Sequence, residues 1–168
     1  CKAVVAESGN DNMFQLTPSA SSTDVIKGKN VFQVCFTDPN QGVASAQYIA
    51  ENKLATKIGI IYDSSDVYSS GIEEKFEAEA KTQGLNIVSK AAFTADSKTD
   101  FGTQLQKAKD AGADLLFLPI YYQEASIILK QADTMGYKPK FFGVDGMDGI
   151  LTVENFDTKL AEDVMLLT

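Results

Sequence analysis

Short apolar runs alternate with amphipathic helical stripes along most of this chain, and that rhythm restricts the folds available to it. The apolar runs show little alternation with polar residues, as expected of strands that are buried on both faces. Strands are predicted over Val31–Phe36, Lys57–Tyr62, Asn86–Phe93, Asp114–Leu118, Lys140–Val144 and Asp163–Leu167, with Met13–Leu16 as a further candidate. Because repeated strand–helix–strand units form right-handed crossovers, the sequence predicts an α/β fold built on a parallel sheet.

The predicted helices have apolar faces and recognisable ends. Their apolar stripes are Ile72, Phe76 and Ala80, then Phe101, Leu105 and Ala108, and then Ala125, Ile128, Leu129, Ala132 and Met135. Ser70 with Glu73 predicts a capping box, and Asp100 is predicted to be an N-cap. Glycines that suit a left-handed residue after the last turn stand at Gly84, Gly112 and Gly136.

The composition excludes several classes of function. The chain has 168 residues, of which 44% are hydrophobic and 23% charged, so it is long enough and apolar enough for one globular domain. A net charge of -8 disfavours nucleic acid and anionic membranes as partners. The chain contains no histidine, which removes the commonest general base and the commonest metal ligand.

The chain ends indicate a fragment, whereas the two cysteines carry little information. Two cysteines, Cys1 and Cys35, form neither a disulfide framework nor a zinc site, and Cys35 is expected to be a buried thiol in a strand. A first-residue cysteine suggests lipid modification, but residues 1–7 look like the end of a helix without a polar tether. We interpret Cys1 as a chain boundary and, because the chain also stops in a strand, expect a piece of a larger protein.

Polar side chains gather in the loops that follow predicted strands. These loops carry Ser19–Thr23, Asp63–Tyr68, Tyr121–Tyr122 and Asp145–Gly146. In open α/β sheets the carboxyl ends of parallel strands are where ligands bind. Hydroxyls, phenols and a carboxylate along one edge suit a small polar molecule that carries both charges, and they suit catalysis poorly.

Several segments together resemble the type I periplasmic binding proteins, in particular the substrate-binding components of branched-chain amino acid ABC transporters. The matching segments are Leu16–Ser22, Val34–Gly42, Ile61–Gly71, Thr99–Phe101, Phe117–Ala125 and Gly143–Gly146. The resemblance covers nearly the whole chain and implies one lobe of a two-lobed protein, a Rossmann-like three-layer, doubly wound and mostly parallel sheet. Residues 1–30 are then expected to be a remnant of the first lobe and the crossover, and residues 31–168 the second ligand-binding lobe.

The resemblance also implies which residues bind the ligand. Asp145 is expected to face the ligand ammonium, Ser19 and Ser21 to hold its carboxylate, and Tyr68 and Tyr121 to form aromatic walls. Local interpretations compete with each role, since Asp-Gly pairs form turns, serines cap helices and tyrosines fill cores. Tyr122 is expected to point the other way.

Neighbouring polar residues are assigned structural roles. The Asp63–Asp66 loop is expected to cap the following helix, and Asp38 before Pro39 to start a helix beside the hinge, with ligand contact secondary. The acidic residues Glu73, Glu74, Glu77 and Glu79 are expected to form a solvated helix face.

The predicted function is capture of an amino acid, branched-chain or similarly small and aliphatic, by hinge closure between two lobes. The expected partners are that ligand and the membrane permease of an ABC transporter, and the fragment is expected to self-associate through residues 1–30. No catalytic residue, cofactor or metal is predicted, and the setting is extracytoplasmic, with lipid anchoring of the full-length protein left open. The alternatives are a ligand-sensing domain of a receptor or regulator and, with Asp63 or Asp145, a carboxylate-dependent hydrolase.

Overall fold

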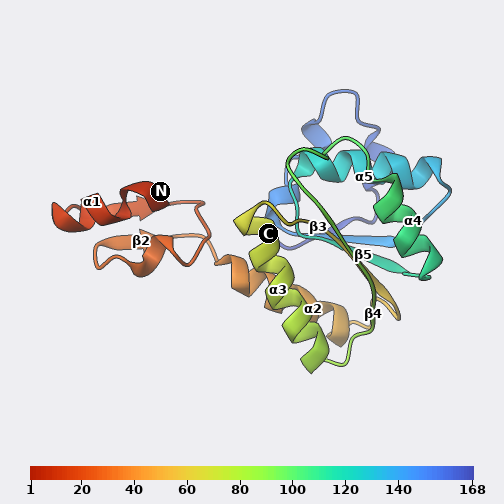
Figure 1. Cartoon of the computed structure of the whole chain (residues 1–168), viewed down its shortest axis with the longest axis horizontal. Helices are drawn as coiled ribbons and strands as arrows, with labels where there is room; N and C mark the ends of the chain where they lie inside the picture. The colour runs from red at the N-terminus through yellow and green to blue at the C-terminus, as the bar shows by residue number, and fades with distance from the viewer.

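The computed structural model describes residues 1–168 and contains two parallel sheets. A two-stranded sheet pairs β1 (Gln15–Thr17) with β2 (Val31–Gln33). A five-stranded sheet has the order β4-β3-β5-β6-β7, with all neighbours parallel. Its strands are β3 (Ile58–Asp63), β4 (Ile87–Phe93), β5 (Leu115–Leu118), β6 (Lys140–Gly143) and β7 (Met165–Leu166). The small sheet stands apart from the large one, joined to it by the segment before α2 (Figure 1).

Helices cover both faces of the large sheet. The helices α2 (Asp38–Glu51) and α3 (Val67–Thr82) pack on one face, against apolar side chains that include Ile60 and Phe117. The helices α4 (Gly102–Asp110) and α5 (Tyr122–Thr134) pack on the other face, against side chains that include Ile61 and Leu116. The sheet lies between these two layers (Figure 1). The α/β, doubly wound, three-layer parallel arrangement expected from the resemblance is therefore confirmed.

The order of the strands creates a switch point between β3 and β5. From β3 the chain passes through α3 to β4, which lies on one side of β3. It then passes through α4 to β5, which lies on the other side of β3. Loops that leave neighbouring strands in opposite directions open a crevice at the carboxyl ends of those strands, which is where ligands bind in such sheets. The loops after β3, β5 and β6 therefore lie at the favoured edge.

The predicted helix ends are partly confirmed. Gly84, Gly112 and Gly136 adopt φ angles of 70°, 72° and 59°, in the left-handed region. The Asp100 carboxylate accepts a hydrogen bond from Gly102 N at 2.9 Å and so caps α4, although Phe101 occupies the N-cap position. The capping box of Ser70 and Glu73 was wrong, because Ser70 lies inside α3 and the N-cap is Asp66, whose carboxylate accepts from Tyr68 N.

Three other local predictions need correction. The strand expected over Val31–Phe36 ends at Gln33, and Val31 pairs with Gln15 of the small sheet rather than with the large sheet. Cys35 follows the strand in a bend and is half-buried, so it is not the buried thiol expected. Glu73 was expected on a solvated helix face but is buried, and Lys90 on β4 compensates its charge at 2.9 Å.

The remaining segments are short. The helix α1 (Val5–Asn10) follows the 3-10 turn η1 (Lys2–Val4), and η2 (Val25–Lys27) leads into β2. After β6 the chain forms η3 (Asp145–Met147), η4 (Ile150–Thr152) and η5 (Thr158–Ala161). None of the helices is both long enough and apolar enough to span a bilayer.

The contact between α2 and α3 depends on a glycine. A Cβ at Gly42 would lie 2.4 Å from the Ile72 carbonyl oxygen and 2.7 Å from Phe76 N. We expect Gly42→Ala to force the helices apart and lower the free energy of unfolding by about 1–3 kcal/mol. The matched control is Gly71→Ala within α3, where a Cβ meets nothing within 4 Å, and a gain of up to about 1 kcal/mol is expected. Urea unfolding of both variants measures the difference, and a Gly42→Ala chain as stable as wild type contradicts the prediction.

Candidate functional site

Loops at the carboxyl ends of three adjacent strands position the candidate residues. The loop after β3 leads into α3, and Tyr68 is the second residue of that helix. Tyr121 follows β5 as the N-cap of α5. Asp145 follows β6 and begins η3. Because β5 pairs with both β3 and β6, these side chains from distant parts of the chain meet at one edge.

Tyr68 and Asp145 are in direct contact. The Tyr68 hydroxyl donates a short hydrogen bond to Asp145 Oδ1 and accepts one from Gly146 N at 2.9 Å. Burial raises the pKa of the Tyr68 phenol well above its usual value, and the Asp145 carboxylate adds to that shift. The phenol is therefore held protonated as a donor to Asp145. A Cβ at Gly146 would lie 2.7 Å from the Tyr68 oxygen, so the contact also requires the absence of a side chain there.

Tyr121 completes an aromatic wall with Tyr68. The two rings stack at a centroid separation of 4.9 Å and an interplanar angle of 22°. Partial burial, with the nearby charges of Asp66, Asp145 and Asp38, raises the pKa of Tyr121 to about 12. Tyr122 packs against the core cluster on the other face of the sheet, as expected.

The wall borders an open cavity of about 580 Å³. The cavity lies between the two parts of the chain, because Ser19 and Ser21 of the loop after β1 line it together with Tyr68 and Tyr121. Ser21 is buried and Ser19 is exposed. Asp145 is not itself in the lining, but it contacts the cavity wall through Tyr68. All the residues proposed for the site thus come together at one edge, and their roles toward a ligand stay a prediction.

Three carboxylates surround this wall without a basic partner. Asp38 and Asp66 line the cavity and Asp145 lies behind Tyr68, while none of the ion pairs in the structure involves any of them. Asp38 is only 5% exposed and its Oδ1 has no hydrogen-bond partner. No group of acidic or sulfur side chains is arranged to hold a metal ion. Lys2 also lines the cavity but pairs with Asp24, so these three carboxylates present unpaired negative charge at this edge.

Gln41 supports Asp145 from α2. It is fully buried, its Oε1 accepts from Asp145 N at 3.2 Å, and its Nε2 has no partner. The sequence places Gln41 beside the hinge turn but offers no sign that it reaches a residue 104 positions away. Only the folded packing of α2 against the sheet reveals that contact.

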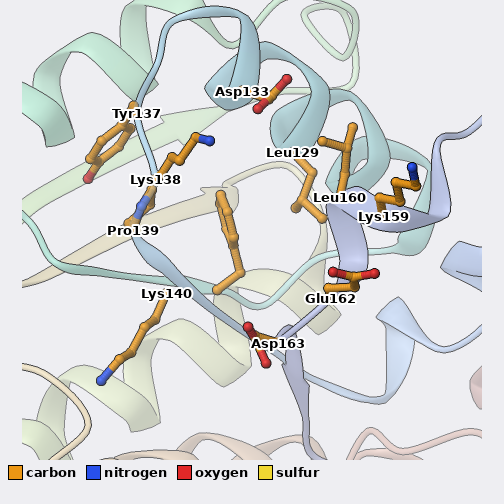
Figure 2. Close-up of a pocket in the computed structure, with 11 residues that line it drawn as sticks. Leu129, Asp133, Tyr137, Lys138, Pro139, Lys140, Lys159, Leu160, Glu162 and Asp163 are labelled. Carbon is orange, nitrogen blue, oxygen red and sulfur yellow. The ribbon is translucent and has the colours of Figure 1, made fainter.

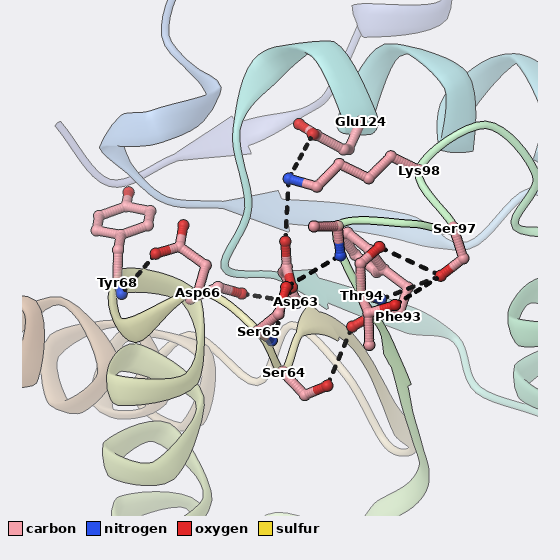
Figure 3. A network of polar contacts seen from close by, with 12 residues as sticks. Asp63, Ser64, Ser65, Asp66, Tyr68, Phe93, Thr94, Ser97, Lys98 and Glu124 are labelled. Atoms are coloured by element: carbon pink, nitrogen blue, oxygen red, sulfur yellow. Dashed lines mark hydrogen bonds and ion pairs between the residues drawn. The ribbon is translucent and has the colours of Figure 1, made fainter.

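An ion-pair network lies beside the wall (Figure 3). Lys98 bridges Asp63 at 3.1 Å and Glu124 at 3.3 Å. Burial alone raises the pKa of Asp63, but hydrogen bonds from Ser65 and the Lys98 ammonium outweigh burial and lower it. The contact with Asp63 raises the pKa of Lys98. Sequence reasoning missed Lys98 and Glu124, because no regular spacing relates them to Asp63.

A second hollow lies at the other end of the sheet. Its volume is about 450 Å³, and Figure 2 shows side chains of both charges around it, including Lys138, Lys159 and Asp133. Lys140, which also lines it, is the first residue of β6, so this hollow is at the amino end of the strands. The convergence of buried polar groups and aromatic rings is at the carboxyl end, and we place the candidate site there.

Comparison with known proteins identifies the family. A family model described as periplasmic binding protein matches residues 2–155. The chain belongs to the periplasmic binding protein family. Among the relatives of this binding protein is the Leu/Ile/Val/Thr-binding protein of Salmonella typhimurium, which is 28% identical over 159 residues, covering 94% of this chain and 43% of the relative.

Solved structures agree with this assignment. A leucine binding protein from Thermotoga maritima superposes with a TM-score of 0.79 at 25% identity, covering 95% of this chain and 43% of that one. A branched-chain amino acid transporter substrate binding protein from Streptococcus pneumoniae, solved in complex with isoleucine, gives 0.76 at 30% identity, covering 86% and 41%. The resemblance read from the sequence is confirmed, and this periplasmic binding protein chain spans less than half the length of these relatives.

The buried Asp38 predicts a pH-dependent stability. Burial raises its pKa, a hydrogen bond from Ser21 opposes that shift, and the charges of Asp145 and Asp66 add to it. With a raised folded-state pKa, the unfolded chain loses this proton first as pH rises, so folded stability falls as pH increases from about 4 through the folded-state pKa. In Asp38→Asn this loss is absent. The variant should therefore unfold at higher urea concentration than wild type at neutral pH, with the gain shrinking toward pH 4.

The midpoints of urea unfolding, measured for wild type and for Asp38→Asn across that pH range, check the prediction. A difference that stays constant with pH contradicts it.

Proposed function

We propose that this chain is the second lobe of an extracytoplasmic solute-binding protein that captures an amino acid, branched-chain or similarly small and aliphatic, for an ABC transporter. A first lobe would complete the site, hinge closure would trap the ligand, and the membrane permease would receive it. The names of the relatives support this proposal, since they describe a Leu/Ile/Val/Thr-binding protein, a leucine binding protein and a branched-chain amino acid transporter protein in complex with isoleucine.

The observation that carries the proposal is the unpaired charge around the tyrosine wall. Asp38, Asp66 and Asp145 face this edge without a lysine partner, so a ligand ammonium would supply the missing cation. Ser19 and Ser21 stand across the cavity, where hydroxyl and backbone N–H groups suit a carboxylate. The stacked rings of Tyr68 and Tyr121 offer apolar surface for an aliphatic side chain.

The same geometry favours binding over chemistry. Tyr68 is protonated and donates to Asp145, so the phenol is no base or nucleophile at neutral pH. The Asp145 carboxylate accepts its hydrogen bond from that phenol rather than from a group that it could activate as a nucleophile. We therefore propose that the ligand leaves unchanged and that the site is not an active site.

The small sheet fits the role of a first-lobe remnant. Its strands expose Leu16 and Phe32, and the ring of Phe14, just before β1, stacks on that of Phe32 at 5.4 Å. Because Val31 pairs with Gln15, we place the change of lobe after Gln33 rather than at residue 30. We propose that further first-lobe residues cover this face, and that its exposure in the isolated chain leads to self-association through residues 1–30.

The proposed setting is outside the cytoplasm, as the family description implies. A lipid anchor on the full-length protein belongs to the proposal as well. Its test is mass spectrometry of the protein purified from its native membrane fraction, in which an acylated N-terminal cysteine supports anchoring and an unmodified chain contradicts it.

A thermal-shift screen of the twenty amino acids on the natural full-length protein tests the proposed function. A ligand that binds only the folded state raises the melting temperature, so leucine, isoleucine or valine should give the largest shift. No shift with any amino acid contradicts the proposal.

The charge of Asp145 should dominate affinity. Asp145→Asn in the full-length protein removes the carboxylate while keeping the size of the side chain, and amino acid affinity is expected to fall about 30-fold or more. Asp148→Asn is the matched control, because Asp148 is exposed and accepts only from Gly149 N. Calorimetry measures both variants, and equal affinities in the two would remove Asp145 from the site.

The isolated chain should bind the same ligand far more weakly than the full-length protein. Affinity for a small ligand depends on burying most of its surface, and the cavity described above is open. Calorimetry on both proteins compares them. Equal micromolar affinities would contradict closure between two lobes.

A further inference from the structure

A single lysine joins the strand that precedes Tyr68 to the helix that follows Tyr121. Lys98 lies in the loop between β4 and α4, and its ammonium contacts Asp63 at the end of β3 and Glu124 in the first turn of α5 (Figure 3). We propose that Lys98 is a positioning residue that sets the spacing of Tyr68 and Tyr121 and thereby the affinity of the site. The inference deepens the proposed amino acid site and rests on it for its binding readout.

Burial makes the lysine necessary. The side chains of Asp63 and Glu124 are only 6% and 10% exposed, while that of Lys98 is 35% exposed. Glu124 Oε2 has no hydrogen-bond partner, so Lys98 is the only cation that compensates this carboxylate. Two carboxylates this poorly solvated repel each other when the cation between them is removed.

Hydrogen bonds carry the constraint from Asp63 to Tyr68. Asp63 Oδ1 accepts from Ser65 N at 2.8 Å and from Ser65 Oγ at 2.6 Å, and Ser65 Oγ in turn accepts from Ala95 N at 3.0 Å. The next residue, Asp66, caps α3 by accepting from Tyr68 N at 3.1 Å. The loop after β3 is thus fastened to the loop that contains Lys98, and Tyr68 follows directly from it.

On the other side, the constraint reaches Tyr121 through the start of α5. Glu124 lies three positions after Tyr121, and the Tyr121 carbonyl accepts the first helical hydrogen bond from Ala125 N at 3.1 Å. A displacement of Glu124 therefore moves the turn that holds Tyr121. Because the rings stack at 4.9 Å, a small shift of either element changes the surface offered to a ligand.

The chain contains a matched control for this arrangement. Lys90 on β4 also bridges two carboxylates, Glu73 at 2.9 Å and Glu77 at 2.6 Å, and the Glu73 side chain is 6% exposed. Both of these acids lie on α3, so the bridge joins that helix to the edge strand and contacts neither tyrosine of the wall. Loss of Lys90 removes a similar buried ion pair without loosening the site.

The two lysine variants should differ in their pH dependence. Three titratable groups face Lys98: the Asp63 carboxylate from β3, the Glu124 carboxylate from α5 and the Tyr121 phenol. Asp66, at the start of α3, also faces that phenol. Lys98 helps to lower the pKa of Asp63, so in Lys98→Met this carboxyl takes up a proton at a higher pH than in wild type, and that protonation relieves its repulsion with Glu124. The loss of affinity should therefore be larger at alkaline than at acidic pH.

The test uses the natural full-length protein with leucine as the probe, each variant being compared with wild type at the same pH. Lys98→Met should lower affinity about 3- to 30-fold near pH 8 and much less near pH 5.5, the range being typical of residues that act through their neighbours. Lys98→Arg keeps the cation and should bind leucine with the wild-type affinity. Lys90→Met should leave affinity unchanged at both pH values, and an equal loss in the two methionine variants overturns the proposal.

A double variant covers the case in which Lys98→Met does not fold. Lys98→Met with Glu124→Gln removes the repelling charge together with the cation, so it should fold and bind with no pH dependence beyond that of wild type. Affinity in the double variant that still falls at alkaline pH overturns the proposal.

Amide exchange without ligand separates this inference from the proposed function. Residues 64–69 and 121–125 should exchange faster in Lys98→Met, or in Lys98→Gln if the methionine variant is unstable, than in wild type or Lys90→Met. If the wild-type protein binds no amino acid, the proposed function fails while this comparison still decides the positioning role. Unchanged exchange in both segments overturns that role.

Discussion

Burial of both faces of the five-stranded sheet is the constraint on which the rest of the structure depends. Helices α2 and α3 cover one face and α4 and α5 the other, so the strands between them must be apolar on both sides. Polar side chains of such strands can reach solvent only at the strand ends. The switch in chain direction between β3 and β5 then decides which ends open into a crevice, and the hydroxyls, phenols and carboxylates gather at that edge.

At this edge some acidic residues are paired with a lysine and others are not. The acidic residues near the tyrosines lack lysine partners, whereas nearby acids such as Asp63 and Glu73 have them. Pairing stabilises the framework, and the unpaired group around Asp145 costs stability because Asp38 is held in a poorly solvated place. Binding sites commonly carry such a cost, because a ligand that completes the charge balance then stabilises the closed form.

Periodicity is enough to predict the elements of the large sheet. The run from Lys57 to Tyr62 and the stripe of Ile72, Phe76 and Ala80 encode burial locally, and the structure places them as β3 and α3. Strand partners and cap choices are not encoded locally: Val31 pairs with Gln15, and Asp66 rather than Ser70 caps α3. The contacts of Gln41, Glu73 and Lys98 join residues from different elements, and no spacing in the sequence relates them.

The site was predictable in position more than in detail. Family resemblance supplied Ser19, Ser21, Tyr68, Tyr121 and Asp145. The fold brings the first four to one cavity, and the fifth, Asp145, lies behind Tyr68. The contact between Tyr68 and Asp145 was not foreseeable from either residue alone. Under the proposed function, the phenol already occupies one oxygen of that acid, and a ligand ammonium, which is a stronger donor than a neutral hydroxyl, is the group best able to compete with it. Uncharged analogues of an amino acid, in which an amide or alcohol replaces the ammonium, would under the proposed function be disfavoured at this residue before the two lobes close.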